Sequence, residues 1–274
     1  MPFDYEQSIW GGGDAEMRLS SPTWFRLKQA LFALRVVSDN GKILEVGCGA
    51  GQFIRAVKHY RPLSECHGVD ISVQAIALAK QKNDGVVYNL STPETMPYAD
   101  NSFDAVVVFD VLEHVGDPRG LLLEISRVLK PQGIFYCFVP CEGDRLSLWH
   151  WLDRLDIKRD LTRKYAGHIN YFTRSEALSL LAKNNWQIRR VRFSEHLLGQ
   201  LAGIAAFMLM DRNARRQGKT QINNESFFEE AKSKGGWIWH LAAYLANAAI
   251  NLESFIFSVI PSPNLHITAI NKKS

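Results

Sequence analysis

Between residues 40 and 140, short apolar runs alternate with segments whose apolar residues recur at helical spacing. The run at 103–109 reads FDAVVVF and is almost wholly apolar, as expected of a parallel strand buried on both faces. Repeated strand, helix and strand predict a parallel sheet with right-handed crossovers. The strands predicted here are 43–46, 67–70, 86–90, 103–109 and 134–140.

The segments between these strands carry helix signals. The helix at 52–60 follows a glycine-rich turn and is closed by Pro62. Ser72 is a suitable N-cap for a second helix, and Asp117 followed by Pro118 for a third that runs to Lys130. The helix predictions therefore fall where the crossovers of a parallel sheet require them.

After Pro140 the alternation changes. Residues 144–170 are rich in Trp, Arg and Asp and predict an irregular helical insertion, and the capping box at 173–176 opens a helix to about Asn184. A sixth strand is predicted at 186–193 and a last one at 265–270, separated by a long apolar helical insert. The predicted regions are an N-terminal helical cap at 1–39, a core at 40–193, and the insert with the last strand at 194–274.

Composition sets broad limits on the kind of protein. The chain has 274 residues and is 46% hydrophobic, so it can bury a sizeable core. The net charge of +4 does not by itself indicate nucleic-acid binding, which usually requires a dense basic face. Four irregularly spaced cysteines indicate reduced thiols in a cytoplasmic protein. We expect neither a secretory signal nor a spanning helix, because no run reaches about 18 uninterrupted apolar residues.

The sharpest chemical signal is EVGCGAG at 45–51, directly after a strand and before a helix. Glycines there let the backbone turn tightly and approach a ligand. The spacing is G-x-G-x-G, with Gln52 where a dinucleotide fingerprint needs its third glycine, which disfavours a nicotinamide dehydrogenase. Glu45 suits a ligand with a cationic group, and Asp70, at the end of the second strand, can accept both hydroxyls of a ribose.

The motifs EVGCGAG, GVDIS, MPYADNSFDAVVVFDVLEHVGDP and LLLEISRVLKPQGIFYCFVP resemble the class I S-adenosylmethionine-dependent methyltransferases, closest to the ubiquinone and menaquinone biosynthesis branch. The resemblance covers about 40–140 strongly and 166–193 weakly. It implies a Rossmann-like α/β fold with a seven-stranded, mostly parallel sheet, helices on both faces, and here a helical apolar insert before the last strand. It also implies S-adenosylmethionine as the cofactor.

The resemblance assigns roles to matching positions. The glycine loop passes beneath the methionine part of the cofactor, with Glu45 near its amino group; Asp70 binds the ribose and Ile71 packs on adenine. The family usually has an acid near position 92, where this chain has Thr92, so the adenine contacts depart from the pattern. The cofactor-binding residues implied are Glu45, Gly47, Cys48, Gly49, Gly51, Asp70, Ile71, Thr92, Phe109 and Asp110, the last two on the methionine and sulfonium side.

Methyl transfer from a sulfonium is an in-line displacement, so the enzyme must position the nucleophile and exclude water. A hydroxyl nucleophile also needs a base, and His114, after the fourth strand, is the first candidate, with His168 the second. Alternatively, Glu113 and His114 only orient their loop. Asp110, Glu113 and His114 fall where some quinone-pathway relatives hold a divalent metal, but Asp110 is shorter than the usual Glu, and we predict no metal.

The helix predicted between Trp237 and Ile260 is apolar except for a narrow polar stripe, and a basic segment at 211–219 precedes it. Such a helix is either an interfacial membrane contact or a lid or dimer face over the site. Each arrangement predicts an apolar pocket, and an apolar pocket favours a lipophilic acceptor. Tyr5, Trp10 and the glycines at 11–13 form either a flap over the cofactor or a frayed tail.

The sequence therefore predicts a cytoplasmic S-adenosylmethionine-dependent methyltransferase that acts on an oxygen of a small lipophilic acceptor, with peripheral membrane contact through 237–260 as a possibility. The alternative is a non-catalytic S-adenosylmethionine-binding scaffold or sensor, whose expected mark, a ruined glycine loop, is not present. A nucleic-acid methyltransferase is disfavoured, because Phe109–Leu112 stands where such enzymes carry N-P-P-[YF] or D-P-P-[YF].

Overall fold

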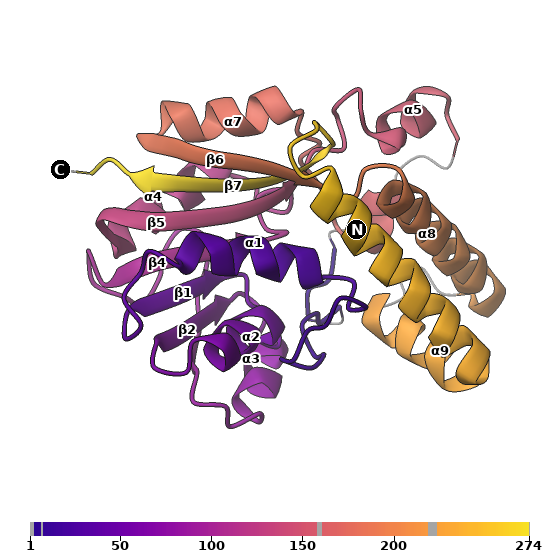
Figure 1. Ribbon diagram of the computed structural model, residues 1–274, viewed down its shortest axis with the longest axis horizontal. Coiled ribbons are helices and arrows are strands. Elements are labelled where there is room, and N and C mark those ends of the chain that lie inside the picture. Colours follow the sequence, from indigo (N-terminus) through magenta and orange to yellow (C-terminus); the bar gives the residue numbers. More distant parts are fainter. Residues whose placement is uncertain (1–2, 7, 158–160, 219–223, 274) are drawn as a thin grey trace.

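The computed structural model describes residues 3–6, 8–157, 161–218 and 224–273, with only the backbone for 224–235 and 238. A seven-stranded sheet forms the centre, in the order β3-β2-β1-β4-β5-β7-β6. Its strands run parallel except β7, which is antiparallel to both β5 and β6 (Figure 1). The strands are β1 (Lys42–Val46), β2 (Glu65–Asp70), β3 (Val87–Leu90), β4 (Phe103–Phe109), β5 (Leu129–Pro140), β6 (Trp186–Ser194) and β7 (Asn264–Asn271).

Helices cover both faces of the sheet and bury a hydrophobic layer on each side. One layer joins Leu44 and Val106 of the sheet to α4 and α7, and the other joins Ile43 and Val107 to α1, α2 and α3. Neighbouring strand residues therefore point to opposite layers, as the pleat requires. The helices are α1 (Trp24–Leu34), α2 (Gln52–Tyr60), α3 (Val73–Lys80), α4 (Pro118–Val128), α5 (Leu148–Arg154), α6 (Leu161–Tyr165), α7 (Arg174–Lys183), α8 (Leu198–Gln217) and α9 (Asn224–Ile256).

The predicted fold class is confirmed, and the predicted boundaries need corrections. The helix expected to reach Lys130 ends at Val128, and β5 begins at Leu129 instead of Ile134. The turn at 131–133 is an irregularity within the strand, where Gln132 adopts a φ of +61° and the register against β4 shifts. Among the described residues before 40, the predicted helical cap contains α1 alone.

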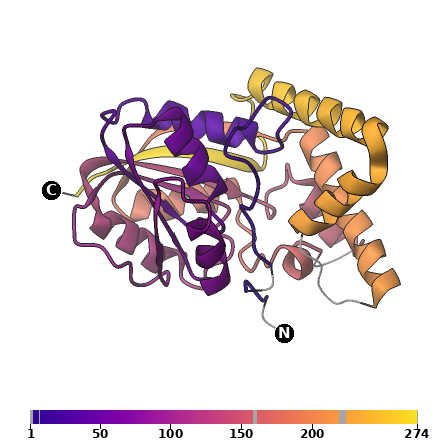
Figure 2. The same cartoon turned by 90° about the horizontal axis from the view of Figure 1, so that it is seen from below.

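The apolar insert consists of α8 and α9, which follow the carboxyl end of β6 and precede β7. They lie beyond the carboxyl ends of the parallel strands, the edge at which ligands bind in such sheets (Figure 1). Seen from below, both helices project beyond the end of the sheet, while the carboxyl end of α9 reaches back to the start of α1 (Figure 2). α9 is broken at Gly236, whose φ of 60° and ψ of −169° are not helical.

Candidate active site

The glycine loop between β1 and α2 folds over the end of β2. The backbone N–H groups of Gly47 and Cys48 both donate to the carbonyl of Val69, at 2.8 and 2.9 Å. Gly47, Gly49 and Gly51 adopt left-handed φ values of 74°, 52° and 87°. A Cβ at Gly49 would lie 2.3 Å from the carbonyl oxygen of Trp10. The loop therefore requires glycine for its conformation and for the close approach of another backbone.

The Asp70 carboxylate lies directly against this loop. Its Oδ2 accepts a hydrogen bond from the Gly49 N–H at 2.7 Å, and its Oδ1 accepts one from the Ser72 N–H at 2.9 Å. Burial raises the pKa of this carboxyl against the lowering effect of those hydrogen bonds. The predicted ribose ligand and the glycine loop, some twenty residues apart, thus form a single structural unit.

Glu45 is buried beneath the loop, with 1% of its surface exposed. Its Oε2 has no hydrogen-bond partner, and burial raises the pKa of the carboxyl well above its usual range. An unpartnered buried acceptor is costly unless a donor or cation meets it. The ammonium group of an amino acid is a donor of the right charge, so this site fits the methionine part of S-adenosylmethionine.

The adenine side of the predicted site is open. Ile71, next to Asp70, is a large apolar side chain that is 53% exposed, which leaves a free surface for a flat aromatic base. Thr92 is exposed, and its backbone forms an isolated bridge with Thr95. Cys48, by contrast, is buried, and burial raises the pKa of its thiol, so its contribution to the loop is packing rather than chemistry.

At the end of β4, the ring of Phe109 stacks on Phe53 with 3.9 Å between centroids, so that side chain belongs to the core. Asp110 follows in a left-handed conformation (φ 51°), and its carboxylate pairs with the Arg26 guanidinium at 2.6 Å. The same guanidinium pairs with Glu195 at 2.8 Å and lies over the Phe138 ring. The sequence did not indicate Arg26, because nothing near it along the chain suggests carboxylate partners 84 and 169 residues away.

The N-terminal segment is a flap rather than a frayed tail. The carbonyl of Trp10 accepts the Ala50 N–H of the glycine loop at 2.7 Å, and Arg55 of α2 donates to the carbonyl of Gly13 at 2.6 Å. The Glu6 carboxylate accepts the backbone N–H groups of Val73 and Gln74 at the start of α3. The segment therefore lies over the loop that the cofactor is expected to contact. The sequence did not indicate Glu6 and Arg55, because their partners in these contacts lie far away along the chain.

Two histidines and two glutamates gather beside the flap. The His114 and His168 rings are 4.9 Å apart between centroids, and the Tyr5 and Trp10 rings also contact His114. His114 Nδ1 lies 3.2 Å from the carbonyl of Gly167, which assigns the proton to Nδ1 and leaves Nε2 free to accept. His114 Nε2 is 3.8 Å from a carboxylate oxygen of Glu113.

The pKa values in this cluster diverge. Glu142 lies 3.1 Å from His168 Nδ1, and it and the neighbouring carboxylates raise the pKa of His168 to about 9 despite burial. Burial and the adjacent His168 charge lower the pKa of His114 to about 3. Burial and the charge of Asp110 raise the pKa of Glu113 to about 8, and both of its carboxylate oxygens lack hydrogen-bond partners. A protonated His168 thus stands beside a neutral His114.

Glu113, His114 and His168 each offer a ligand atom, and these atoms lie within 4.8 Å of one another. A metal ion would have to displace the proton of His168, because a protonated imidazole has no lone pair to donate. Asp110, the third residue of the metal set considered from sequence, is held by Arg26 instead. The cluster can therefore act in acid–base chemistry, or hold a metal ion once His168 gives up its proton.

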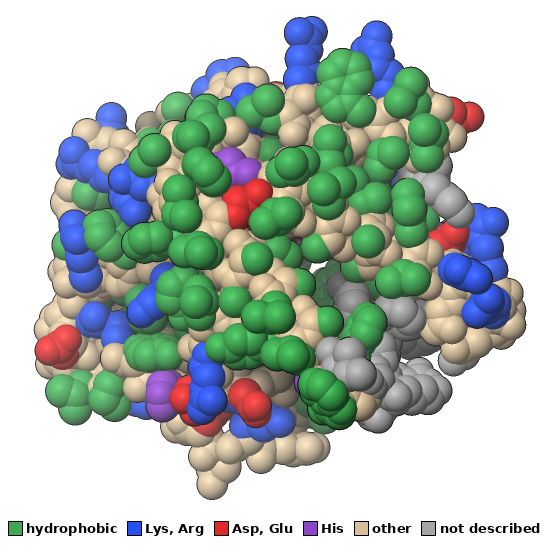
Figure 3. All heavy atoms as spheres, turned by 45° about the vertical axis from the view of Figure 1, so that its right-hand side comes forward, with side chains coloured by type: hydrophobic (Ala, Val, Ile, Leu, Met, Phe, Trp, Pro, Cys, Tyr) green, Lys and Arg blue, Asp and Glu red, His purple; other side chains and the backbone are tan. Residues whose placement is uncertain are grey.

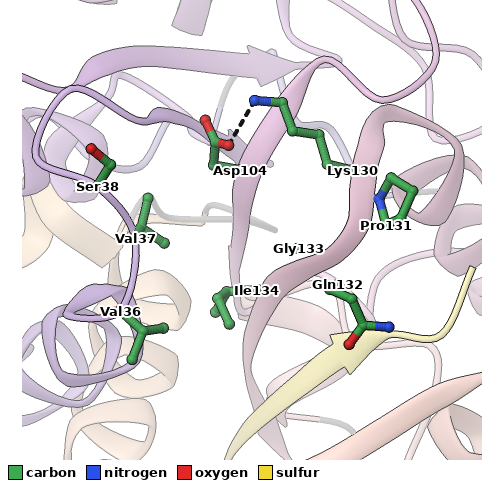
Figure 4. A pocket seen from close by; sticks show the side chains of 9 residues that line it. All are labelled: Val36, Val37, Ser38, Asp104, Lys130, Pro131, Gln132, Gly133 and Ile134. Carbon is green, nitrogen blue, oxygen red and sulfur yellow. Dashed lines mark hydrogen bonds and ion pairs between the residues drawn. The ribbon is translucent and has the colours of Figure 1, made fainter.

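A shallow pocket of about 270 Å³ lies elsewhere on the protein, lined by the segments 36–38 and 130–134 and by Asp104, which pairs with Lys130 (Figure 4). It lies at the amino end of β4, whereas the glycine loop and the histidines lie at the carboxyl edge of the sheet. The pocket is thus on the wrong edge of the sheet to take part in the chemistry described above.

Comparison with known proteins connects this geometry to a family. A model described as a methyltransferase domain matches residues 44–137. Residues 44–137 are therefore similar to a methyltransferase domain. The match begins within β1 and ends within β5, so it contains the glycine loop, Asp70, Asp110 and His114. S-adenosylmethionine is the cofactor of this family.

An uncharacterized methyltransferase of Schizosaccharomyces pombe is 33% identical over 127 residues, which are 42% of this chain and 45% of that protein. A demethylmenaquinone methyltransferase of Lactiplantibacillus plantarum is 30% identical over 134 residues, 45% of this chain and 56% of that one. The chain spans about half the length of the curated relatives it matches. The sequence likeness therefore belongs to the methyltransferase domain, and the rest of the chain lies outside it.

Solved structures extend the likeness of fold. The [4+2]-cyclase SpnF superimposes with a TM-score of 0.57 at 20% identity, over all of this chain and 89% of SpnF. At this identity the likeness is one of fold alone, and SpnF is a [4+2]-cyclase. The shared fold thus supports the seven-stranded architecture and leaves the reaction to be argued from the site.

Proposed function

We propose that this protein is a methyltransferase that transfers the methyl group of S-adenosylmethionine to an oxygen of a small lipophilic acceptor. The observation that carries the proposal is the pairing of a glycine loop and Asp70 with a buried histidine cluster on one edge of the sheet. The glycine loop and Asp70 suit the cofactor, and the histidine cluster lies where the acceptor would meet the cofactor.

The cofactor would be held by the residues that the sequence indicated. Asp70 would bind the ribose hydroxyls, Glu45 the amino group, and the exposed face of Ile71 the adenine. When bound, S-adenosylmethionine supplies a methyl group already activated by the positive charge on sulfur. The flap, which is held on the glycine loop by the hydrogen bond from the Ala50 N–H to the Trp10 carbonyl, would exclude water from the cofactor. Exclusion of water strengthens electrostatic contacts inside the site.

The histidine cluster would receive the proton of the acceptor hydroxyl. The methyl group becomes bonded to the acceptor oxygen as its bond to sulfur breaks, and the hydroxyl proton passes to Nε2 of His114. An ionised Glu113, 3.8 Å away, would stabilise the imidazolium. The Gly167 carbonyl fixes the tautomer that leaves Nε2 free. Such positioned bases typically contribute ~10²–10⁴ in rate.

The lipophilic character of the acceptor is argued from the insert. α8 and α9 carry mainly apolar side chains, lie at the edge of the sheet that holds the histidines, and follow β6 directly. An acceptor that dissolves in lipid would be met at a bilayer, so we include peripheral membrane contact through 237–260 in the proposal. Among the described residues, none of the helices combines the length and apolarity needed to traverse a bilayer.

The experiment is incubation of the purified protein with a lipid extract and with isotopically labelled S-adenosylmethionine, followed by mass spectrometry. We expect S-adenosylhomocysteine to form and a labelled methyl ether or ester to appear in the organic phase. Cofactor binding by calorimetry with no labelled product from lipid or aqueous extract would contradict the proposal and favour the scaffold or sensor. Label on carbon or nitrogen would contradict the oxygen assignment.

A further inference from the structure

The C-terminal half of α9 has the reverse of the polarity usual for a surface helix. Asn251 and Ser254, members of the polar stripe, are only 2% and 1% exposed. Phe255, Ile256 and the following Val259 are 64%, 59% and 65% exposed. A helix on a water-facing surface turns its apolar stripe to the core. Here the polar stripe faces the protein and the apolar side chains face outward.

The inward polar residues make specific contacts that fix this orientation. The Asn251 amide donates to the carbonyls of Leu19 and Ser21 and accepts the N–H of Phe25, at the start of α1. The Ser254 hydroxyl accepts the N–H of Glu195 at 3.0 Å. Rotating the helix to bury its apolar face would leave these backbone groups unpaired in the interior, so its apolar exposure is built into the fold.

The exposed apolar residues continue along α9 and onto the start of α8. We define the insert face by six of them: Leu201, Trp237, Leu245, Leu252, Phe255 and Val259, each between 50% and 73% exposed. In the space-filling view, many hydrophobic side chains gather on this side of the molecule, interrupted by other surface and by one acidic and one histidine side chain, with most Lys and Arg side chains at its margins (Figure 3). A gathering of exposed apolar side chains of this kind marks an interaction site rather than ordinary surface.

The charges around the insert face decide between the two obvious occupants. Arg212 and Arg216, near the end of α8, are exposed. The acidic side chains described in α8 and α9 are Asp211 and Glu253. Asp211 is buried and paired with Lys164 and Arg215, and Glu253 accepts the first N–H groups of α8.

The second oxygen of Glu253 has no partner but is buried. A second copy of the chain docked on this face would thus find no accessible free carboxylate there for its arginines, among the side chains that the structure describes. The phosphates of an anionic bilayer would provide an anionic partner for each of the two arginines. Trp237, Trp239 and Tyr244 are exposed on α9, and such side chains favour the boundary between lipid and water.

We infer that the insert face is a docking surface for an anionic lipid bilayer, on which α8 and α9 lie in the plane of the interface. The helices insert their apolar side chains among the acyl chains while the arginines meet the headgroups. The inference deepens the proposed function, on which its biological sense rests: docking places the carboxyl edge of the sheet at the membrane, where a lipophilic acceptor resides.

The test is flotation of the full chain with vesicles of phosphatidylcholine, with and without phosphatidylglycerol. We expect retention on the anionic vesicles, weakened by salt. A Phe255→Gln/Val259→Gln variant should lower the partition coefficient at least about tenfold, because it removes two of the most exposed apolar side chains. An Arg212→Gln/Arg216→Gln variant should lower it by roughly tenfold or more, on anionic vesicles only.

Leu63→Gln is the matched control, since Leu63 is 72% exposed on the body of the protein, away from the insert. It should float like the wild type. Absence of flotation, or flotation insensitive to both insert variants, would overturn the inference. Sedimentation that shows a dimer broken by Phe255→Gln/Val259→Gln would assign the face to a second copy instead.

Calorimetry with S-adenosylmethionine is run on the same proteins and keeps the two proposals apart. The insert variants should bind the cofactor like the wild type. Wild-type protein that floats but does not bind S-adenosylmethionine would sink the proposed function and leave the docking surface standing. Protein that binds the cofactor but does not float would sink the docking surface, and with it the membrane contact through 237–260, and leave the proposed methyl transfer standing.

Discussion

The β4 strand and the α9 helix are both strongly apolar, yet their side chains have opposite fates. Every apolar residue of β4 is buried, between α4 and α7 on one side and α1 to α3 on the other. In α9, side chains as large as Phe255 and Trp237 remain more than half exposed. The difference shows that apolar side chains in this chain have two fates, since in the sheet they build the core and in the insert they remain on the surface, where we propose that a bilayer covers them.

The largest expected effect tests this comparison directly with two leucines. Leu44→Ala removes a fully buried side chain of β1 and should lower the free energy of unfolding by about 3–4 kcal/mol. Leu245→Ala, at a side chain that is 57% exposed, should change it by less than ~0.5 kcal/mol. Urea denaturation monitored by circular dichroism measures both. Equal losses would mean that the insert face is buried in solution.

The next effect concerns the cofactor. Asp70→Ala leaves the N–H groups of Gly49 and Ser72 and both ribose hydroxyls without their acceptor, so affinity for S-adenosylmethionine should fall on the order of 100-fold. Calorimetry provides the measurement, and the exposed Glu94→Ala serves as the control. Retention of wild-type affinity would remove Asp70 from the cofactor site.

A third experiment targets Arg26, which holds one carboxylate from the methyltransferase domain and one from the root of the insert. Arg26→Met removes the cation between Asp110 and Glu195, although Glu195 keeps its hydrogen bond from Asn264. It should destabilise the fold by about 2 kcal/mol, below the range usual for broken buried pairs, because all three side chains are partly exposed. Arg26→Lys, which keeps the charge, should recover part of the loss. Unfolding that matches the wild type would show that the two regions are not linked there.

The smallest expected effect is the pH dependence. The pKa of Glu113 is raised to about 8, so its ionised form, which stabilises a protonated His114, dominates only above that value. Between one pH unit below the pKa of Glu113 and one unit above it, the ionised fraction of Glu113 rises by roughly tenfold. The value of kcat/KM should rise with that fraction. Glu113→Gln should flatten the profile over this range. A wild-type rate that is constant across it would exclude Glu113 from the proton transfer.

The sequence alone determined the sheet and located the glycine loop and Asp70 at the ends of its strands. Periodicity placed the strands and crossovers, since buried parallel strands and amphipathic helices leave local signatures. The glycine loop and Asp70 were readable for the same reason, because tight turns and strand ends are local features. The errors fell at Lys130 and Ile134, where a left-handed Gln132 lets the chain turn within a strand.

The tertiary structure decided which groups meet. Arg26 with Asp110 and Glu195, Glu6 with the start of α3, and His168 with Glu142 join residues far apart in the chain, so no local pattern announces them. It also decided which way α9 faces. The sequence shows a polar stripe and an apolar face but does not indicate which one meets the rest of the protein, because that depends on the backbone groups before and at the start of α1 that Asn251 bonds.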